Sequence, residues 1–552
     1  MSRIQTILAR LIPAAQRFRQ TALRFSARLR PSQQNHPPLS LKESTSDGCL
    51  RDGPTPIDQS VYAEATFTAG HIFIFLMVGV LLCYSSVLVI PYAFSDDYLF
   101  LIAHAGLPGT GNTSATYAFI ANGRPTGALL TDLFFSYANT IGDLRYLRLW
   151  GVIGIGLLAW SIDRALVRVG WSRKQTVLLS VIICTLPSFQ VYASCATALF
   201  YPFAALASGR ALAMAERACD EQCRLYKWSL VAGAVLLLLV AFTIYQPAAM
   251  FFWVFAAIGL LTRDASLPFL RRRVLWHSAV AFAGLSLGFG VYQLGLAYGR
   301  NIFPPRSELA HDILGKVLWF LRWPLVDALS LAKLSGSPAL ALSVAIFIAG
   351  GLLLYFGDEA KKCLLKFLLA LAFIPLSYLP NLVIAENWSA YRTQSALTSV
   401  IVVYAFLALQ GYERTLLRPT TASPLTAGLG FAALVSALLA AYNVSTYFAF
   451  PQILELRFMR SHWAQQDLSQ VRSFYIIPST WQNFCAPAVY YDEFGFPSSA
   501  HPLSPGPMVY LLLRETKQER LGLPIEAVPA AGPINPPPGA LVIDMRKLAN
   551  FR

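Results

Sequence analysis

The sequence predicts an all-α polytopic membrane protein of about 11 transmembrane helices, with a small outward C-terminal domain of α+β structure. Composition is the first reason: hydrophobic residues make up 55% of the 552 residues, charged residues only 13%, and the mean hydropathy is +0.50. Soluble domains carry about 25% charged residues, so a disordered chain, a coiled coil and a plain cytosolic enzyme are excluded. Eight cysteines exclude a disulfide scaffold.

The second reason is a series of apolar runs that approach the roughly 20 residues needed to cross the hydrocarbon core. Two of these runs are separated only by Tyr245-Gln246-Pro247, which favours a tight hairpin between two short spans over one long kinked helix. The expected spans lie near 71–90, 149–166, 176–192, 196–213, 229–245, 248–262, 276–297, 338–356, 367–384, 395–411 and 424–446.

The third reason is the distribution of Lys and Arg. Alternate loops carry about twice as many basic residues as the others, and basic loops stay on the inner side. This places the N-terminus in the cytoplasm and the C-terminus outside, provided that the hairpin makes the number of spans odd. The net charge of +15 is then explained by topology, and no nucleic-acid partner is expected. The basic inner loops lie at 164–174, 210–227, 263–273, 361–366 and 414–418.

Residues 1–68 precede the first span and divide into a basic arm and a linker. Residues 1–42 contain no Asp or Glu, and apolar residues recur at helical spacing between arginines in 3–29. This pattern is typical of an amphipathic segment on an anionic inner leaflet. An organellar transit peptide or a solvated tail would have a similar composition.

The part after the last span, 447–552, contains no further crossing segment. It has possible strands at 474–477, 508–513 and 540–543. We therefore expect an extracytoplasmic cap there. The transmembrane module is 69–446, with outer loops at 91–148, 298–336 and 385–394.

Motifs that would carry familiar soluble chemistry are absent. The sequence has no phosphate-cradling Gly-x-x-x-x-Gly-Lys-Ser/Thr loop and no His-Glu-x-x-His. Few ionisable residues fall in the middle of a span, which argues against a carrier that couples transport to ions.

The most informative motif is Ser95-Asp96-Asp97-Tyr98, just after the first span. Adjacent carboxylates repel, which predicts a raised pKa for one of them and a base or metal ligand near the outer surface. The alternative is structural: Ser95 or Asp96 would cap a helix that starts at Asp97.

The outer loop 91–148 continues with an apolar stretch, 114–138, that predicts a helix lying at the membrane interface. Asn122-Gly123-Arg124-Pro125 would form a turn in it. A guanidinium at this height suits a lipid phosphate, although Arg124 would equally fit an interfacial snorkelling residue. Lys333 and Arg392 add positive charge from the two later outer loops, and Glu386 adds a carboxylate.

This arrangement resembles the C-type (GT-C) membrane glycosyltransferases over about 70–450. An acidic motif in the first outer loop, a following interfacial helix and later outer cations carry the resemblance. Within that superfamily it is most similar to bacterial glucosyltransferases that modify O-antigen (the Gtr type II-like group), in which a Ser-Asp-Asp-Tyr-like motif precedes Asn-Gly-Arg-Pro, as at 95–98 and 122–125. The N-terminal arm and the C-terminal cap have no counterpart in it.

The resemblance implies a transferase in a bacterial inner membrane that uses a polyprenyl-phosphate sugar, with glucose expected, and modifies a lipopolysaccharide glycan or another acceptor. Asp96 would be the base, with Asp97 orienting it or binding a divalent cation; no cofactor is otherwise expected. The remaining site residues are assigned to the donor phosphate (Arg124, Arg392, Lys333) and to the sugar or acceptor (Tyr98, Asn122, Gln246, Glu386). The alternatives are a transporter or flippase of a lipid-linked saccharide and a non-catalytic assembly factor.

Overall fold

The computed structural model describes a largely helical chain with one small sheet. The part from Glu64 to Arg552 forms one compact unit, and the expected basic arm lies outside the described residues. These are 59–104, 113–262, 265–299, 308–357, 359–416, 424–464, 470–479, 493–501, 503–515, 524–527 and 535–550.

Seven described helical stretches are long and apolar enough to cross a membrane, or up to eight if one bent pair forms a single span. The described helices are α2 (Gln59–Cys83), α3 (Ser85–Val89), α4 (Asp96–His104), α5 (Thr113–Ala121), α6 (Pro125–Phe135), α7 (Leu144–Arg168), α8 (Arg173–Cys184), α9 (Pro187–Ser194), α10 (Tyr201–Asp220), α11 (Arg224–Ile244), α12 (Gln246–Ala249), α13 (Phe251–Leu260), α14 (Leu267–Gly299), α15 (Ile313–Arg322), α16 (Pro324–Leu329), α17 (Pro338–Phe356), α18 (Ala360–Leu376), α19 (Leu379–Val383), α20 (Ser395–Leu416), α21 (Pro424–Val444), α22 (Phe450–Ala464) and α23 (Pro505–Glu515).

The eleven expected spans are therefore not all confirmed, although each expected run is helical. The apolar stretches Ala69–Cys83 and Gln246–Leu260 are short, and the run expected at 367–384 is divided between α18 and α19. The run expected at 176–192 is bent by 61° between α8 and α9, where Pro187 begins the second helix. At α9 and α12 the break combines an extended residue before the helix with a proline in its first turn, which counting apolar residues does not register.

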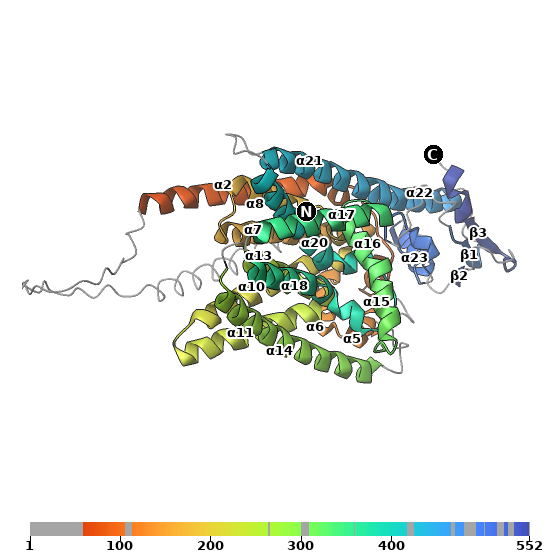
Figure 1. Cartoon of the computed structure of the whole chain (residues 1–552). Helices are drawn as coiled ribbons and strands as arrows, with labels where there is room; N and C mark the ends of the chain where they lie inside the picture. The colour runs from red at the N-terminus through yellow and green to blue at the C-terminus, as the bar shows by residue number, and fades with distance from the viewer. Residues whose placement is uncertain are drawn as a thin grey trace, which may run out of the picture. The chain divides into compact units, whose positions relative to one another are not determined.

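The hairpin expected at Tyr245-Gln246-Pro247 is present. Tyr245 has an extended backbone between α11 and α12. α11 runs antiparallel to α10, since Gly233 faces Met214. α13 runs parallel to α10, since Tyr245 stacks on Tyr201 and Phe255 faces Gly209. The chain thus reverses at Pro247. It then returns through α14, which lies beside α11 (Figure 1).

The loops expected on the two sides of the membrane gather at opposite ends of the bundle. Arg168, Arg217 and Arg273, from three expected inner segments, line one cavity. Residues of the outer loops meet at the other end, where Lys316 contacts Glu386 and Asn387. The full alternation of inner and outer loops, and the side that faces the cytoplasm, stay predictions.

The C-terminal cap begins as a direct continuation of the last span. α21 passes through a π-helical turn, Ser445–Ala449, into α22, and the two form one long rod that leads to the sheet (Figure 1). The sheet has the order β2-β1-β3, with both pairs parallel. Its strands are β1 (Ser473–Ile477), β2 (Ile525–Ala527) and β3 (Ala540–Asp544).

Two of the three expected strands are confirmed as β1 and β3, but the strand expected at 508–513 is wrong. These residues lie in α23, which has Pro505 in its first turn and buries Met508, Leu512 and Leu513. Leu and Met are good helix formers. A connection between two parallel strands also needs a crossover, usually a helix, and α23 provides it between β1 and β2.

The cap and the first outer loop share one hydrophobic core. Phe100 and Leu101 of α4 belong to the same buried cluster as Met459 of α22, Phe474 of β1 and Leu512 of α23. All five side chains are at most 2% exposed. The segment that carries Asp96 and Asp97 is therefore fixed by residues from both ends of the described chain.

Candidate functional site

The Asp-Asp motif lies at the start of α4, held by an unusual backbone conformation. Ser95 has a φ of 46°, a left-handed conformation that costs a non-glycine residue about 1 kcal/mol or more. Its N–H donates to Ser498 Oγ at 3.0 Å, and its carbonyl accepts from Ser504 Oγ at 3.3 Å. Two serines of the cap thus hold the residue that precedes Asp96.

The two carboxylates of the motif have opposite environments. Asp96 is 41% exposed at its side chain, whereas Asp97 is fully buried. Asp97 accepts hydrogen bonds from the N–H groups of Phe94 (3.1 Å) and Thr197 (3.0 Å). Burial raises the pKa of Asp97, and the Arg148 guanidinium and backbone N–H groups oppose this rise. The raised pKa therefore comes from desolvation of Asp97. Repulsion by Asp96, the cause expected from the sequence, is not needed to explain it.

Arg148 is the buried partner of Asp97, and the sequence did not single it out. It is fully buried near the start of α7 and pairs with Asp97 at 3.3 Å. It also donates to the carbonyls of Tyr92 (2.6 Å) and Ser194 (2.9 Å), and its guanidinium lies 3.7 Å from the centre of the Tyr92 ring. Asp97 and Arg148 therefore join three segments and leave Asp96 as the accessible acid of the motif.

The expected turn at Asn122-Gly123-Arg124 separates α5 from α6 and presents Arg124. Gly123 has a φ of +70°, and a Cβ there would approach Tyr292 to within 2.8 Å. Gln246 donates to the carbonyl of Asn122 at 2.8 Å and accepts from Arg124 Nε at 2.9 Å. The hairpin between α11 and α13 thus orients the arginine.

A pair of stacked aromatic rings lies beside these charges. Tyr201 and Tyr245 are nearly parallel, with ring centres 3.7 Å apart and an interplanar angle of 3°. The guanidinium of Arg124 lies 4.7 Å from the centre of the Tyr245 ring. Tyr192, whose ring meets both tyrosines edge-on, donates its hydroxyl to the carbonyl of Arg392. The structure therefore places the guanidinium of Arg124 and the backbone of Arg392 at one group of tyrosines.

Arg392 is held in the third outer loop by a carboxylate from the cap. It pairs with Glu493 at 3.3 Å, and its guanidinium lies 4.7 Å from the centre of the Trp388 ring. Its carbonyl accepts from the Tyr192 hydroxyl at 2.9 Å. The bend between α8 and α9 places Tyr192 for this contact.

Lys316 of α15 connects the second and third outer loops. Its ammonium donates to the Glu386 carbonyl at 2.7 Å and to Asn387 Oδ1 at 2.9 Å. Burial lowers the pKa of Lys316 to about 8, and the charge of Glu386 acts in the opposite direction. Lys316 thus fixes the loop that carries Arg392.

The other assigned residues are placed differently from what their assigned roles require. Tyr98 is fully buried, so it is not available to a sugar. The side-chain amide of Asn122 donates to the Ala118 carbonyl, and that of Gln246 bonds Asn122 and Arg124 in the turn. Lys333 is exposed, but no contact found among the described residues joins its side chain to Asp96 or the two arginines. Glu386 contributes its backbone carbonyl to Lys316.

A histidine of the cap, which sequence reasoning missed, faces Asp96. His501 Nε2 lies 4.0 Å from Asp96 Oδ1. Its Nδ1 accepts from the N–H of Leu503 at 3.4 Å and lies 3.2 Å from Ser504 Oγ, so a neutral imidazole carries its proton on Nε2. No local sequence signal connects His501 or Glu493 with a motif some 400 residues earlier.

The motif is poorly suited to hold a divalent cation. Both oxygens of Asp97 already accept hydrogen bonds from protein groups. No group of three or more His, Cys, Asp or Glu side chains that could hold a metal ion is found in the described ranges. The alternative of a cation at Asp97 is therefore not supported by its contacts.

No protein-family model matches the sequence, and no curated protein sequence matches it. Two solved structures from Archaeoglobus fulgidus are similar to it. One is the archaeal oligosaccharyltransferase AglB in complex with an inhibitory peptide and a dolichol-phosphate, at 11% identity and a TM-score of 0.38, covering 82% of this chain and 68% of that chain. The other is an oligosaccharyltransferase in complex with Zn and sulfate, at 10% identity and a TM-score of 0.37, covering 75% and 64%.

Proposed function

We propose that this chain is a membrane glycosyltransferase that moves a sugar from a polyprenyl-phosphate donor to a glycan or lipid acceptor at the outer face. The sugar that we propose is glucose, and the acceptor is a bacterial cell-surface glycan such as O-antigen. One observation carries the proposal. The accessible Asp96 precedes Asp97, which accepts from the N–H of Thr197, four residues before Tyr201. Arg124 lies over the Tyr245 ring that stacks on Tyr201, and the carbonyl of Arg392 accepts from Tyr192 beside the pair.

Asp96 serves as the general base. It accepts the proton of the acceptor hydroxyl while the acceptor oxygen bonds to the anomeric carbon of the sugar. The bond between that carbon and the phosphate oxygen breaks, and its electron pair leaves with the lipid phosphate. A positioned base contributes about 10²–10⁴-fold to such a step.

Arg124 and Arg392 stabilise the negative charge that grows on the leaving phosphate. Each is oriented before the reaction by a hydrogen bond or ion pair, Arg124 by Gln246 and Arg392 by Glu493. Preorganised donors of this kind stabilise developing charge without reorganisation. We assign Lys333 no role in this step.

Asp97 acts through position. Its buried contacts with Arg148, Thr197 and Phe94 fix the start of α4, so that Asp96 is presented from a rigid segment. A fixed geometry is what allows a base to act within hydrogen-bond reach of the acceptor hydroxyl.

The test compares purified wild type with Asp96→Asn in nanodiscs that contain polyprenyl-phosphate glucose and a lipid-linked glycan acceptor. We expect kcat to fall by about 10²–10⁴-fold, because the amide cannot accept the proton. Asp312→Asn is the matched control. Asp312 caps α15 by accepting from Gly315 N–H at 2.8 Å, and Asn caps a helix equally well, so transfer is expected to stay near wild type.

Transfer that survives Asp96→Asn unchanged would remove the assigned base. If the wild type binds the donor without transferring glucose, other polyprenyl-phosphate sugars are supplied in turn. Movement of the intact donor between leaflets without transfer of any sugar would overturn the proposal in favour of a flippase.

A further inference from the structure

A second basic site lies far from Asp96. A cavity of about 250 Å³ opens between α7, α10 and α13, lined among others by Arg164, Arg168 and Arg210. Arg164 follows the buried Arg148 by 16 residues on α7, which is about 24 Å along the helix axis. The cavity therefore lies toward the opposite end of the bundle, which we expect to face the cytoplasm.

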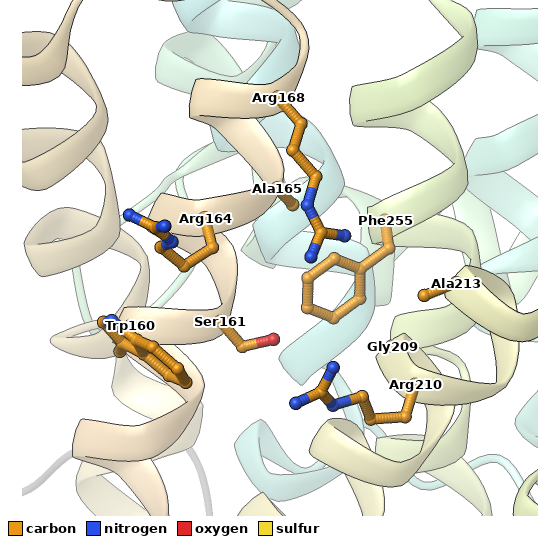
Figure 2. A pocket seen from close by; sticks show the side chains of 9 residues that line it. All are labelled: Trp160, Ser161, Arg164, Ala165, Arg168, Gly209, Arg210, Ala213 and Phe255. Atoms are coloured by element: carbon orange, nitrogen blue, oxygen red, sulfur yellow. The ribbon is translucent and has the colours of Figure 1, made fainter. Parts of the chain in front are cut away.

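The cavity is built from regularly spaced residues of two helices. Trp160, Arg164 and Arg168 recur every four residues and so share one face of α7. Arg210 projects from α10, and Gly209 leaves room for the ring of Phe255, which a Cβ would approach to within 2.5 Å. Figure 2 shows Arg168 and Arg210 directed from different helices toward the space beside Ser161 and Phe255.

The positive charge in this cavity has little compensation from the protein. No acidic residue lines it, and Arg164 and Arg210 form no ion pair or hydrogen bond within the described ranges. Glu216 and Asp220 line the adjoining cavity and pair with Arg273. Asp163, beside Arg164 in sequence, is bound to Arg173 and Thr176.

A buried donor adds a second, independent observation. The indole Nε1–H of Trp160 is buried and has no hydrogen-bond partner. An unpaired buried donor costs about 1–3 kcal/mol, so it favours an occupant with acceptor oxygens. Guanidinium groups, an indole N–H and the Ser161 hydroxyl can each donate to a phosphate group.

We propose that this cavity binds the phosphate headgroup of an anionic membrane lipid. Trp160 contacts Phe73 of α2, with ring centres 5.7 Å apart. The next residues of α2, Ile74 and Phe75, are about 60% exposed and offer apolar surface to acyl chains. The volume is below the roughly 300–1,000 Å³ of sites for whole small ligands, so it suits a headgroup. Basic pockets between spans on the cytoplasmic side bind anionic headgroups.

The test measures the melting temperature of purified full-length protein in detergent with added phosphatidylglycerol or phosphatidylcholine. We expect phosphatidylglycerol alone to raise Tm. The double variant Arg164→Gln/Arg210→Gln should need at least about tenfold more of this lipid for the same rise, because charge-assisted contacts to phosphate are lost.

The matched control is Arg224→Gln/Arg271→Gln, which removes the same charge from exposed residues expected on the same side. It should keep the wild-type response, and both double variants should melt alike without lipid. Equal loss of response in the two variants would overturn the site. A second contrary result is a rise in Tm with millimolar inorganic phosphate and no lipid, in a way that depends on Arg164 and Arg210. That result would overturn the assignment to a lipid and identify a soluble phosphate as the occupant.

Discussion

At the scale of single residues, the Asp96–Asp97 pair shows how one motif supplies two functions. The neighbours share a backbone, but Asp97 is buried against Arg148 and two N–H groups while Asp96 is exposed. A carboxylate whose oxygens are already bonded cannot readily take a proton from a substrate. The exposed member is therefore the base in our proposal, and the buried member positions it.

His501 gives the residue-scale prediction. Its Nε2 lies 4.0 Å from Asp96 Oδ1, a distance that can shorten to a hydrogen bond in the substrate complex, so His501→Ala should lower kcat by roughly tenfold. His501→Gln should restore most of the rate, because the glutamine amide can donate from the same place. We classify His501 as a positioning residue.

A comparison of the two variants separates this role from a structural one. His501→Ala should lower kcat at an unchanged melting temperature, whereas His501→Gln should keep both kcat and the melting temperature near wild type. Equal kcat values for the two variants would contradict the assignment.

Candidate site residues could be selected from the sequence where a reactive residue type stands in a recognisable motif or outer loop. Asp96, Arg124 and Arg392 were selected because acids and cations in outer loops suit phosphate transfer. The structure places the guanidinium of Arg124 and the backbone of Arg392 at one group of tyrosines. Glu493 and His501 were missed because their role depends on how the cap packs on the first outer loop. Tyr98 was chosen for its place in the motif, but α4 turns its ring into the core.

At the scale of elements, the turn between α5 and α6 determines where Arg124 points. Gly123→Ala would place a Cβ against Tyr292 and strain a positive φ, so the turn and Gln246 should shift. We expect kcat/KM to fall by roughly tenfold, since a displacement of about 1 Å at a charge-stabilising group has effects of this order or more.

Gly170→Ala is the control for this change. Gly170 also has a positive φ, of +87°, but a Cβ there meets nothing within 4 Å. Both variants should lose about 1 kcal/mol of stability from the backbone, while only Gly123→Ala should lose transfer activity. Equal activities in the transfer assay would show that the turn does not control Arg124.

Elements were predictable where hydrophobic pattern and local propensity agree, as for β1 and β3. The error at 508–513 arose because a short run of large apolar residues fits a buried strand or a buried helix equally well. Only the topology separates them, since β1 and β2 are parallel and need a crossover between them. The number of spans was not confirmed for a related reason: composition does not show where a helix bends.

At the scale of the whole molecule, the outer end is one cooperative structure made from both ends of the described chain. Leu512 of α23 is fully buried in the cluster that contains Leu101 of α4, and α23 contacts α4. Leu512→Ala should destabilise this unit by about 2–5 kcal/mol. The loss should reach α4 and lower transfer, although Leu512 itself does not line the proposed site.

Hydrogen exchange tests this coupling. The amides of α4 and the Thr197 N–H that bonds Asp97 should exchange faster in Leu512→Ala together with those of β1, because cooperative units open as a whole. Leu503→Ala makes the same chemical change at a side chain 58% exposed and keeps its N–H, so exchange in α4 should stay unchanged. Faster exchange confined to the cap in Leu512→Ala would mean that the first outer loop holds Asp96 in place without it.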